Sequence, residues 1–351
     1  MKVRWQKNRA DVGDYGSEAP TATHRVINLR TWVLVASILG AAFAALFLPF
    51  LLSTYDKEIL VLFVINVMLV LGYRTITTMG GWSFAHTAIM GLGSYTMAIL
   101  TQEEFGVSFW LTLPLAAVAA GIFSALLSYP VLRTRGFYFF LSTFAAGEAL
   151  RQSYKQFTGI TGGTYGISFI PRPESILGVS FESTISYYYL VLIFTIVIAI
   201  MLIMFNGSRF GRTITAVAQN EELSLSIGIN TRRYRMIAFV LGSAIAGVAG
   251  VFFANFNGII NPADFGSSLM FKVIAAAIVG GVRTIWGPIL GLFYLTMLEE
   301  LFFSYADWVP LLWGVSVIGI LIFAPNGLES IATSFLTRCR ASITRLFDAL
   351  T

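Results

Sequence analysis

Residues 185–205 read ISYYYLVLIFTIVIAIMLIMF, an apolar run without a charged side chain. A helix of about 20 apolar residues is long enough to cross the hydrocarbon core of a bilayer. Of the 351 residues of the chain, 56% are hydrophobic and 12% are charged, whereas soluble domains contain about 25% charged residues. We therefore expect an all-α, polytopic membrane protein.

Further apolar runs on both sides of this stretch predict about ten membrane-spanning helices. The second and the eighth run are short, and we expect them to tilt little or to cross half of the bilayer. The spans form a transmembrane domain over residues 31–328, between an N-terminal tail (1–30) and a C-terminal tail (329–351). The predicted spans are residues 31–52, 59–74, 83–101, 109–132, 137–154, 185–205, 234–256, 267–282, 286–304 and 310–324.

The basic residues indicate how the chain is oriented, because cytoplasmic segments of membrane proteins are enriched in Lys and Arg. With the N-terminus placed inside, 18 of the 23 basic residues fall in inner segments, and 3 (Lys57, Lys155 and Arg172) fall in outer loops. This asymmetry favours ten spans with both termini in the cytoplasm. The net charge of +5 then reports orientation, and we expect no nucleic-acid partner.

Several kinds of site are missing from the sequence. The polar tail 1–30 lacks the apolar core of a signal peptide, and His24 within it is expected to be solvated. The single cysteine, Cys339, excludes an internal disulfide framework and a cysteine-rich metal site. No P-loop, zinc-protease or serine-hydrolase motif occurs. We expect a conduit with no catalytic residues, no metal site and no cofactor in this chain.

Two connections between spans are long. The outer one, residues 155–184, contains five glycines and two prolines, so turns rather than a helix should order it. The inner one, residues 206–235, has helical spacing in its middle. Its segment 212–228 predicts a helix that is too polar to span the bilayer and that lies across the cytoplasmic membrane surface.

Six motifs occur in order within residues 72–328: SFAH…GLGSY, RTRGFYFFLSTFAAGEALR, TGGTYGI, AQNEELSLSIGIN, IVGGVRTIWGPILG and PNGL. Together they resemble the branched-chain amino-acid ABC permeases of the LivH/LivM type, and the LivM half more than the LivH half. The chain departs from the family pattern at Ala85, which replaces a glycine, and at Ile89, which replaces an aromatic residue. It also carries Lys272 in a span that is usually uncharged. These departures leave the substrate open.

The resemblance implies a permease subunit of a binding-protein-dependent importer in the bacterial cytoplasmic (inner) membrane. A second homologous permease would complete the translocation pathway, and two ATP-binding subunits would bind ATP and Mg and power it. A soluble extracytoplasmic binding protein would deliver the cargo, which would be branched-chain or related apolar amino acids. Two alternatives stay open. One is the same machine carrying urea, short amides or aromatic acids, and the other is a stand-alone channel or ion-coupled carrier, which needs no ATPase dock.

Segment 212–228 also resembles the coupling segment of this family. Glu222 and Gly228 have the spacing of the E-A-A-x-x-x-G signature, in which a helix docks into a groove on the ATPase. The glycine would permit a sharp exit and close packing. An ordinary amphipathic surface helix fits the same residues equally. The predicted coupling residues are Arg212, Glu221, Glu222 and Gly228.

Polar residues inside the apolar spans are candidates for the substrate pathway, because such side chains are costly in lipid and should face protein or water. His86 either lines the pathway or bonds a neighbouring carbonyl and locks two helices together. Glu148 and Arg151 lie at i and i+3 on one helix face, where they either pair with each other or read a zwitterionic substrate. Lys272 either pairs with Glu148 or snorkels outward. The candidates are Ser83, His86, Thr87, Ser94, Thr143, Glu148, Arg151 and Lys272.

Overall fold

The computed structural model describes residues 47, 49–102, 105–175, 178–324 and 327–330. Contacts divide the chain into two units, Met1–Ser53 and Thr54–Thr351, and the architecture described here is that of the second unit. The N-terminal tail and most of the first predicted span, 31–52, lie outside the described residues, as does segment 331–351 of the C-terminal tail.

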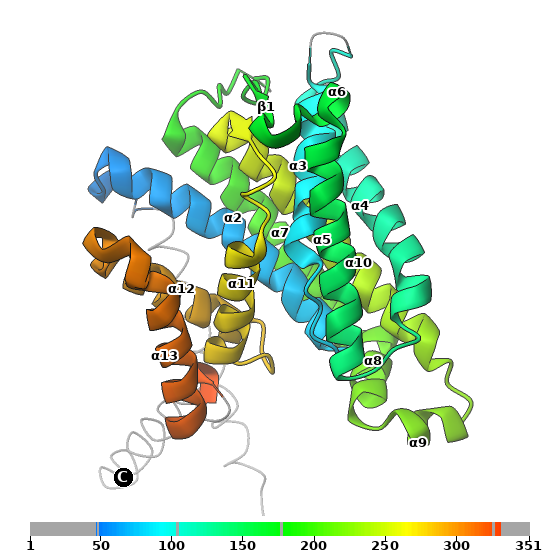
Figure 1. Cartoon of the computed structure of the whole chain (residues 1–351). Helices are drawn as coiled ribbons and strands as arrows, with labels where there is room; N and C mark the ends of the chain where they lie inside the picture. The colour runs from blue at the N-terminus through cyan, green and yellow to red at the C-terminus, as the bar shows by residue number, and fades with distance from the viewer. Residues whose placement is uncertain (1–46, 48, 103–104, 176–177, 325–326, 331–351) are drawn as a thin grey trace, which may run out of the picture. The chain divides into compact units, whose positions relative to one another are not determined.

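Helices make up most of the described part of the second unit (Figure 1), and nine of them overlap the second to the tenth predicted spans. Four of these, α2, α4, α7 and α10, are long and apolar enough to cross a membrane, and α11 and α13 are shorter apolar helices. The all-helical prediction is confirmed, while the total of ten spans and the sides of the termini stay predictions. The nine helices are α2 (Thr54–Thr77), α3 (His86–Leu100), α4 (Phe109–Val131), α5 (Phe137–Gln156), α7 (Thr184–Gly207), α10 (Thr231–Asn257), α11 (Ser267–Gly280), α12 (Trp286–Leu301) and α13 (Val309–Phe323).

The second predicted span proves longer than expected. Helix α2 begins at Thr54 and has 24 residues, because the charged residues 56–58 end the apolar run in the sequence without ending the helix. Asp56 lies in the first turn, where a negative charge is favourable next to the positive end of the helix dipole. Helix α11 has 14 residues, as the short eighth span predicts.

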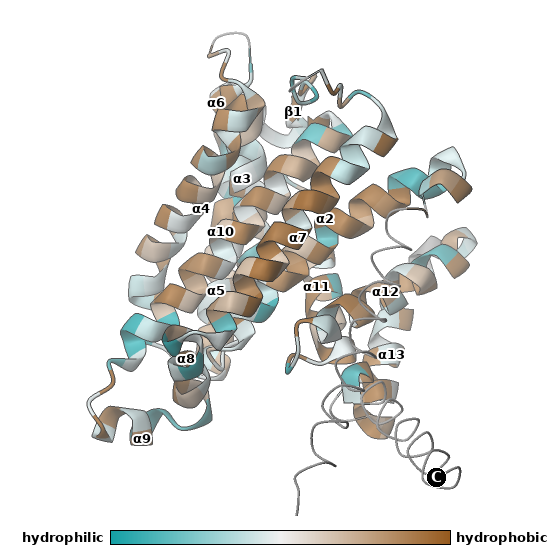
Figure 2. Ribbon diagram, turned by 180° about the vertical axis from the view of Figure 1, so that it is seen from behind, coloured by the Kyte–Doolittle hydropathy of each residue, from teal (hydrophilic) through white to brown (hydrophobic). Residues whose placement is uncertain are grey.

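Helix α10 is the element around which α2, α3 and α4 pack. Glycine permits the close approach of α3: a Cβ atom at Gly250 would lie 2.0 Å from the Met90 carbonyl oxygen, and one at Gly93 would lie 2.1 Å from the Gly247 carbonyl oxygen. Small residues allow membrane helices to approach in this way. Figure 2 shows hydrophobic residues along these helices and hydrophilic residues gathered at α8 and α9.

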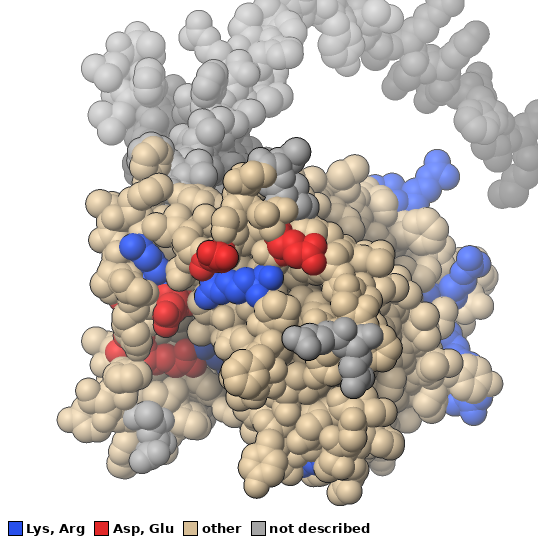
Figure 3. Space-filling model, turned by 90° about the horizontal axis from the view of Figure 1, so that it is seen from above, with Lys and Arg blue, Asp and Glu red and all other residues tan. Residues whose placement is uncertain are grey.

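The outer connection is ordered by short elements and turns, as predicted. It contains α6 (Thr158–Thr161), the 3-10 turn η1 (Gly163–Tyr165) and β1 (Ile167–Ser168), which pairs antiparallel with β2 (Ile259–Ile260). Gly166 has a φ of +74°, and a Cβ atom there would lie 1.8 Å from the Ile260 carbonyl oxygen, so this position requires glycine. Seen from above, at the end that carries α6 and β1, the surface is mostly uncharged (Figure 3).

The inner connection contains two helices instead of the single helix predicted over 212–228. Helix α8 (Arg209–Gln219) ends at Asn220, whose extended backbone (φ −153°, ψ 98°) starts α9 (Glu221–Ser226). The Asn220 side-chain oxygen accepts a hydrogen bond from the Leu223 backbone N–H at 2.9 Å, a capping interaction that asparagine favours. A single helix over 212–228 would place the predicted coupling residues Glu221 and Glu222 near its middle, whereas they lie in the first turn of α9.

The folded domain extends to Glu329, the first residue of the predicted C-terminal tail. The buried Glu329 carboxylate accepts hydrogen bonds from the backbone N–H (3.0 Å) and the hydroxyl (2.8 Å) of Thr284. From α2, Arg74 donates to the carbonyl oxygens of Thr284 (2.8 Å) and Arg283 (3.0 Å). Two buried charged side chains thus hold the turn between α11 and α12.

Candidate functional site

A small pocket opens where α3, α5 and the start of α11 meet. Its volume of about 10 Å³ is roughly the least that can hold one water molecule. Three predicted pathway residues, Thr87, Glu148 and Arg151, line it together with Phe84, Ala88, Phe144, Gly147, Phe265, Gly266 and Ser267. Segments that are far apart in the sequence therefore converge on part of the predicted pathway.

Glu148 and Arg151, which line this pocket, form an ion pair with each other. The Arg151 Nε donates to Glu148 Oε2 at 2.8 Å, and the Gln152 side-chain amide donates to Glu148 Oε1, also at 2.8 Å. A second guanidinium nitrogen of Arg151 bonds Oε1, which makes the ion pair bidentate. The predicted mutual pairing is confirmed. Since both side chains stay partly exposed, the pocket wall is polar but carries no net charge from this pair.

Lys272 has a partner other than Glu148. Its ammonium group pairs with the Glu299 carboxylate, which α12 places beside α11. Of the two alternatives for Lys272, pairing with Glu148 is wrong, because α11 turns Lys272 towards α12 rather than towards α5. Among the described residues, no group of three or more His, Cys, Asp or Glu side chains could hold a metal ion.

His86 is fully buried, and its Nε2 lies 3.0 Å from the Leu69 carbonyl oxygen of α2. Of the two roles expected for His86, the structure shows the lock between two helices. Ser94 plays a similar part, since its hydroxyl donates to the Gly250 carbonyl oxygen at 2.8 Å. These two residues connect α3 to α2 and to α10, inside the protein rather than on an open wall.

The other three polar candidates also bond backbone groups. Thr143 accepts from the Phe84 N–H at 2.9 Å and donates to the Phe140 carbonyl oxygen at 2.8 Å. The Ser83 hydroxyl accepts from the Ala85 N–H at 3.3 Å, and Thr87 donates to the Phe265 carbonyl oxygen at 3.4 Å. Of the five polar candidates outside the charged residues, only Thr87 therefore lines the pocket.

An aromatic cluster borders the pocket, and sequence reasoning did not single out its central residue. The Phe84 ring makes edge contacts with Phe140 (5.4 Å between centroids), Phe144 (5.0 Å) and Phe271 (5.4 Å). Such edge-to-face pairs are favourable arrangements of aromatic rings. Phe144 and Phe271 remain exposed, so this surface offers aromatic carbon next to the neutral ion pair.

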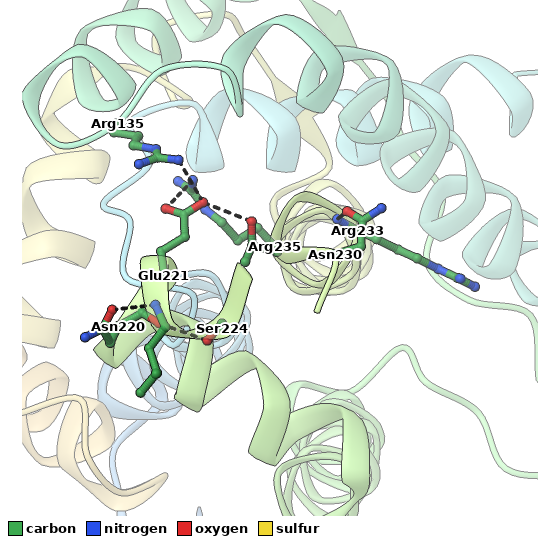
Figure 4. A network of polar contacts seen from close by, with 9 residues as sticks. Arg135, Asn220, Glu221, Ser224, Asn230, Arg233 and Arg235 are labelled. Carbon is green, nitrogen blue, oxygen red and sulfur yellow. Dashed lines mark hydrogen bonds and ion pairs between the residues drawn. The ribbon is translucent and has the colours of Figure 1, made fainter. Parts of the chain in front are cut away.

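In the inner connection, at the start of α9, Glu221 joins three segments (Figure 4). Its carboxylate accepts a hydrogen bond from the Thr231 hydroxyl at 3.0 Å, lies 3.3 Å from a guanidinium nitrogen of Arg135, and lies 3.8 Å from one of Arg235. Thr231 and the buried Arg235 belong to α10, and Arg135 to the turn between α4 and α5. The sequence did not predict that either arginine contacts Glu221, because nothing in the local pattern assigns these residues a partner.

The remaining coupling residues face outward. Glu222 is exposed, and Leu223, Leu225 and Ile227 have 49–69% of their surface accessible. Gly228 has a φ of +83° with no other atom near its Cβ position, so within this chain the backbone conformation, and not close packing, accounts for the glycine. Arg212 is also exposed and bonds the last carbonyl of α7.

Comparisons with known proteins identify the family of this chain. The family model for the branched-chain amino acid transport system permease component matches residues 55–325. The chain is 27% identical to the high-affinity branched-chain amino acid transport system permease protein LivM of Escherichia coli, over 93% of this chain and 81% of the relative. It is 28% identical to the autoinducer 2 import system permease protein LsrC of Yersinia enterocolitica, over 76% and 72%.

A LivH permease of Salmonella typhimurium is 26% identical over 74% of this chain and 90% of the relative. No solved structure gives a significant match. The family model covers well over half of the chain, and two LivM proteins match 93% and 80% of it. The chain therefore belongs to the branched-chain amino-acid transport permease family, a family of membrane-embedded transporter subunits, and it resembles LivM more than LivH.

Proposed function

We propose that this chain is a transmembrane permease subunit of an ATP-driven importer for branched-chain or related apolar amino acids. The observation that carries the proposal is the exposed surface of α9. Leu223 and Leu225, Ile227 directly after the helix, and Glu222 are exposed on a polar inner connection. The chain itself has no nucleotide-binding motif. Such a surface suits an ATPase subunit that supplies the motion from outside the chain.

The pathway surface supports an apolar cargo. The Glu148–Arg151 pair is internally neutralised, the exposed Phe144 lines the same pocket, and the exposed Phe271 contacts the Phe84 ring of that pocket. A substrate with an aliphatic side chain and a small polar end would contact both kinds of surface without meeting an unpaired charge. The same machine carrying urea, short amides or aromatic acids is the alternative, and a stand-alone channel or ion-coupled carrier is disfavoured by the exposed α9 surface.

The proposed assembly contains a second homologous permease, two ATP-binding subunits that hold ATP and Mg, and a soluble extracytoplasmic binding protein. Its proposed location is the cytoplasmic (inner) membrane of a bacterial cell. The pocket of about 10 Å³ is far too small for an amino acid, which fits a pathway that a second permease completes. The proposal is tested by reconstituting the chain with its candidate partners and measuring uptake of labelled leucine. Uptake should require ATP, and uptake that proceeds equally without ATP would contradict the proposal.

Glu148→Gln is expected to lower the yield of folded permease, because it removes the ion pair with Arg151. The decrease should be modest, since the pair is partly exposed and ion pairs of this kind contribute about 0–1 kcal/mol. Uptake per assembled complex should change by less than about threefold. The measurement is uptake normalised to the amount of complex recovered by size-exclusion chromatography. Glu299→Gln, which disrupts the Lys272 pair, serves as a matched control away from the pocket. Normal assembly with lost transport in Glu148→Gln alone would instead show that the carboxylate reads the substrate.

The topology is tested by labelling single cysteines in a Cys339→Ser background. Tyr165, which is 90% exposed in η1, is expected to react as Tyr165→Cys with a membrane-impermeant maleimide in intact cells. The exposed Ser226 at the end of α9 should react as Ser226→Cys only after permeabilisation. Labelling of the second variant in sealed cells would contradict the proposed orientation.

A further inference from the structure

Helix α4 has two faces of different composition. One face consists of small residues that pack against α10: a Cβ atom at Gly247 would lie 2.6 Å from the Ala120 Cβ and 3.0 Å from the Ala116 carbonyl oxygen. The other face is a continuous exposed stripe, in which each residue follows the previous one after three or four positions and has 40–70% of its surface accessible. The stripe consists of Leu111, Leu115, Val118, Ile122, Leu126 and Tyr129.

The composition of this stripe favours lipid over another helix. Membrane helices that pack together place small residues at the contact, and α4 uses its small residues on the α10 face. The stripe is instead made of large aliphatic side chains, which do not let another helix backbone approach closely. It ends in a tyrosine, a residue enriched at the interface between membrane and water.

Two arginines meet at this tyrosine. The guanidinium carbon of Arg133 lies 4.6 Å from the centroid of the Tyr129 ring, and that of Arg232 lies 4.5 Å from it. Arg232 also donates a hydrogen bond to the Tyr129 carbonyl oxygen at 2.6 Å. The two distances between guanidinium carbon and ring centroid are within the range of cation–π contacts. The ring and the carbonyl thus fix two positive charges, from the α4–α5 turn and from α10, at one end of the apolar stripe.

Neither charge is neutralised within the part of the chain that the structure describes. The ion pairs observed there involve Arg135, Arg151, Arg235 and Lys272, and both Arg133 and Arg232 are exposed. Guanidinium groups are well suited to phosphate oxygens, because their planar donors form paired hydrogen bonds. Two uncompensated guanidinium groups next to an acyl-chain surface complement the two halves of a phospholipid.

We propose that Tyr129, Arg133, Arg232 and the α4 stripe form a binding site for an anionic phospholipid. The headgroup phosphate contacts the two arginines, and an acyl chain lies along the stripe. An anionic lipid is favoured over a neutral one because no carboxylate of the described chain offsets the two charges. The choice of leaflet rests on the proposed topology, which places this end of α4 in the cytoplasmic leaflet, where anionic lipids attract basic residues. The site itself does not depend on the transport function.

The test uses the full-length chain purified in mild detergent with any subunits that accompany it. Native mass spectrometry would follow the binding of phosphatidylglycerol and, separately, of phosphatidylcholine. Arg133→Gln with Arg232→Gln is expected to weaken phosphatidylglycerol binding about 25-fold, or about fivefold for each basic residue at the surface. It should weaken phosphatidylcholine binding less, because the choline cation offsets the charge of that lipid's phosphate. Replacing both arginines by lysine should restore most of the affinity, because the positive charge remains. The restoration should be incomplete, because the planar fork of the guanidinium group is lost.

The matched control is Arg209→Gln with Arg233→Gln, which removes two exposed arginines without touching the ion pairs of Glu221; the Arg233 side chain points away from the Glu221 network in Figure 4. It carries the same change in charge and should weaken binding by less than about threefold, because the guanidinium groups found at Tyr129 in the described residues are those of Arg133 and Arg232. Equal losses in the two double variants would overturn the proposal. So would displacement of the lipid by millimolar inorganic phosphate, which indicates a free-anion site, or loss of an accompanying subunit from the first variant alone, which indicates a protein interface.

Discussion

Replacing Glu221 by glutamine is expected to leave the ATP-binding subunits attached and to lower uptake per ATP hydrolysed about tenfold. The carboxylate connects α9 to the first two turns of α10, through the Thr231 hydroxyl and the buried Arg235. Helix α10 in turn packs against α2, α3 and α4. Under the proposed function, a movement imposed on α9 by an ATPase would reach the bundle through this side chain.

The size of the effect follows from the loss of a charge. Glutamine keeps the shape of the side chain and can still accept a hydrogen bond from Thr231, but it leaves Arg235 buried without its anionic partner. The Thr231 hydroxyl also donates to a neutral group in this variant. Hydrogen bonds to charged groups contribute about 1.5–3 kcal/mol, against about 0.5–1.5 kcal/mol for neutral ones, and about 1.4 kcal/mol corresponds to a factor of ten in a rate or equilibrium. The measurement is the ratio of leucine uptake to ATP hydrolysis in reconstituted vesicles.

Glu222→Gln is the matched control, since it removes the same charge from the next residue of α9. Glu222 is exposed and turned outward, so its replacement should weaken ATPase association in a salt-dependent way and leave coupling intact once the complex has formed. Arg135→Gln separates the contribution of the α4–α5 turn, because it preserves the contacts of Glu221 with α10. A normal uptake-to-hydrolysis ratio in Glu221→Gln would show that α9 transmits its motion by another route.

Gly250→Ala is expected to have the largest effect on folding. The new Cβ atom would lie 2.0 Å from the Met90 carbonyl oxygen and 2.9 Å from Ser94, where neither backbone can yield without separating α3 from α10. The separation would also break the hydrogen bond from the Ser94 hydroxyl to the Gly250 carbonyl oxygen. Overpacking of a core costs about 1–3 kcal/mol or more, and the clash here is with backbone atoms, so little folded permease should be recovered.

Gly121→Ala is the control for this substitution. Gly121 lies on α4, and its added Cβ would have Val240 at 3.8 Å and Ala244 at 4.0 Å as its nearest neighbours, which are ordinary contact distances. Alanine also has a higher helix propensity than glycine, so this variant should fold at least as well as the parent. The readout is the monodisperse fraction and the midpoint of thermal unfolding in detergent. Similar recovery of both variants would mean that the α3–α10 crossing is looser than these distances indicate.

The amino-acid sequence determined the features that depend on neighbouring residues. The uncharged run over 185–205 is sufficient for α7, because hydrophobic length alone places a helix across a bilayer. The glycines of the outer connection predicted its turns, and the i, i+3 spacing of Glu148 and Arg151 predicted their pairing. Even the break between α8 and α9 has a local cause, the cap at Asn220, although the helical spacing around it pointed to one continuous helix.

The tertiary structure decided which residues meet across helices. Lys272 contacts Glu299 rather than Glu148, and Glu221 gathers Arg135 and Arg235 from two other segments. These partners depend on the rotation of each helix about its axis and on where two helices cross. Both are fixed by glycine contacts such as that of Gly250 with α3. A periodic pattern within one helix identifies its faces, but it carries no information about the neighbour that each face will meet.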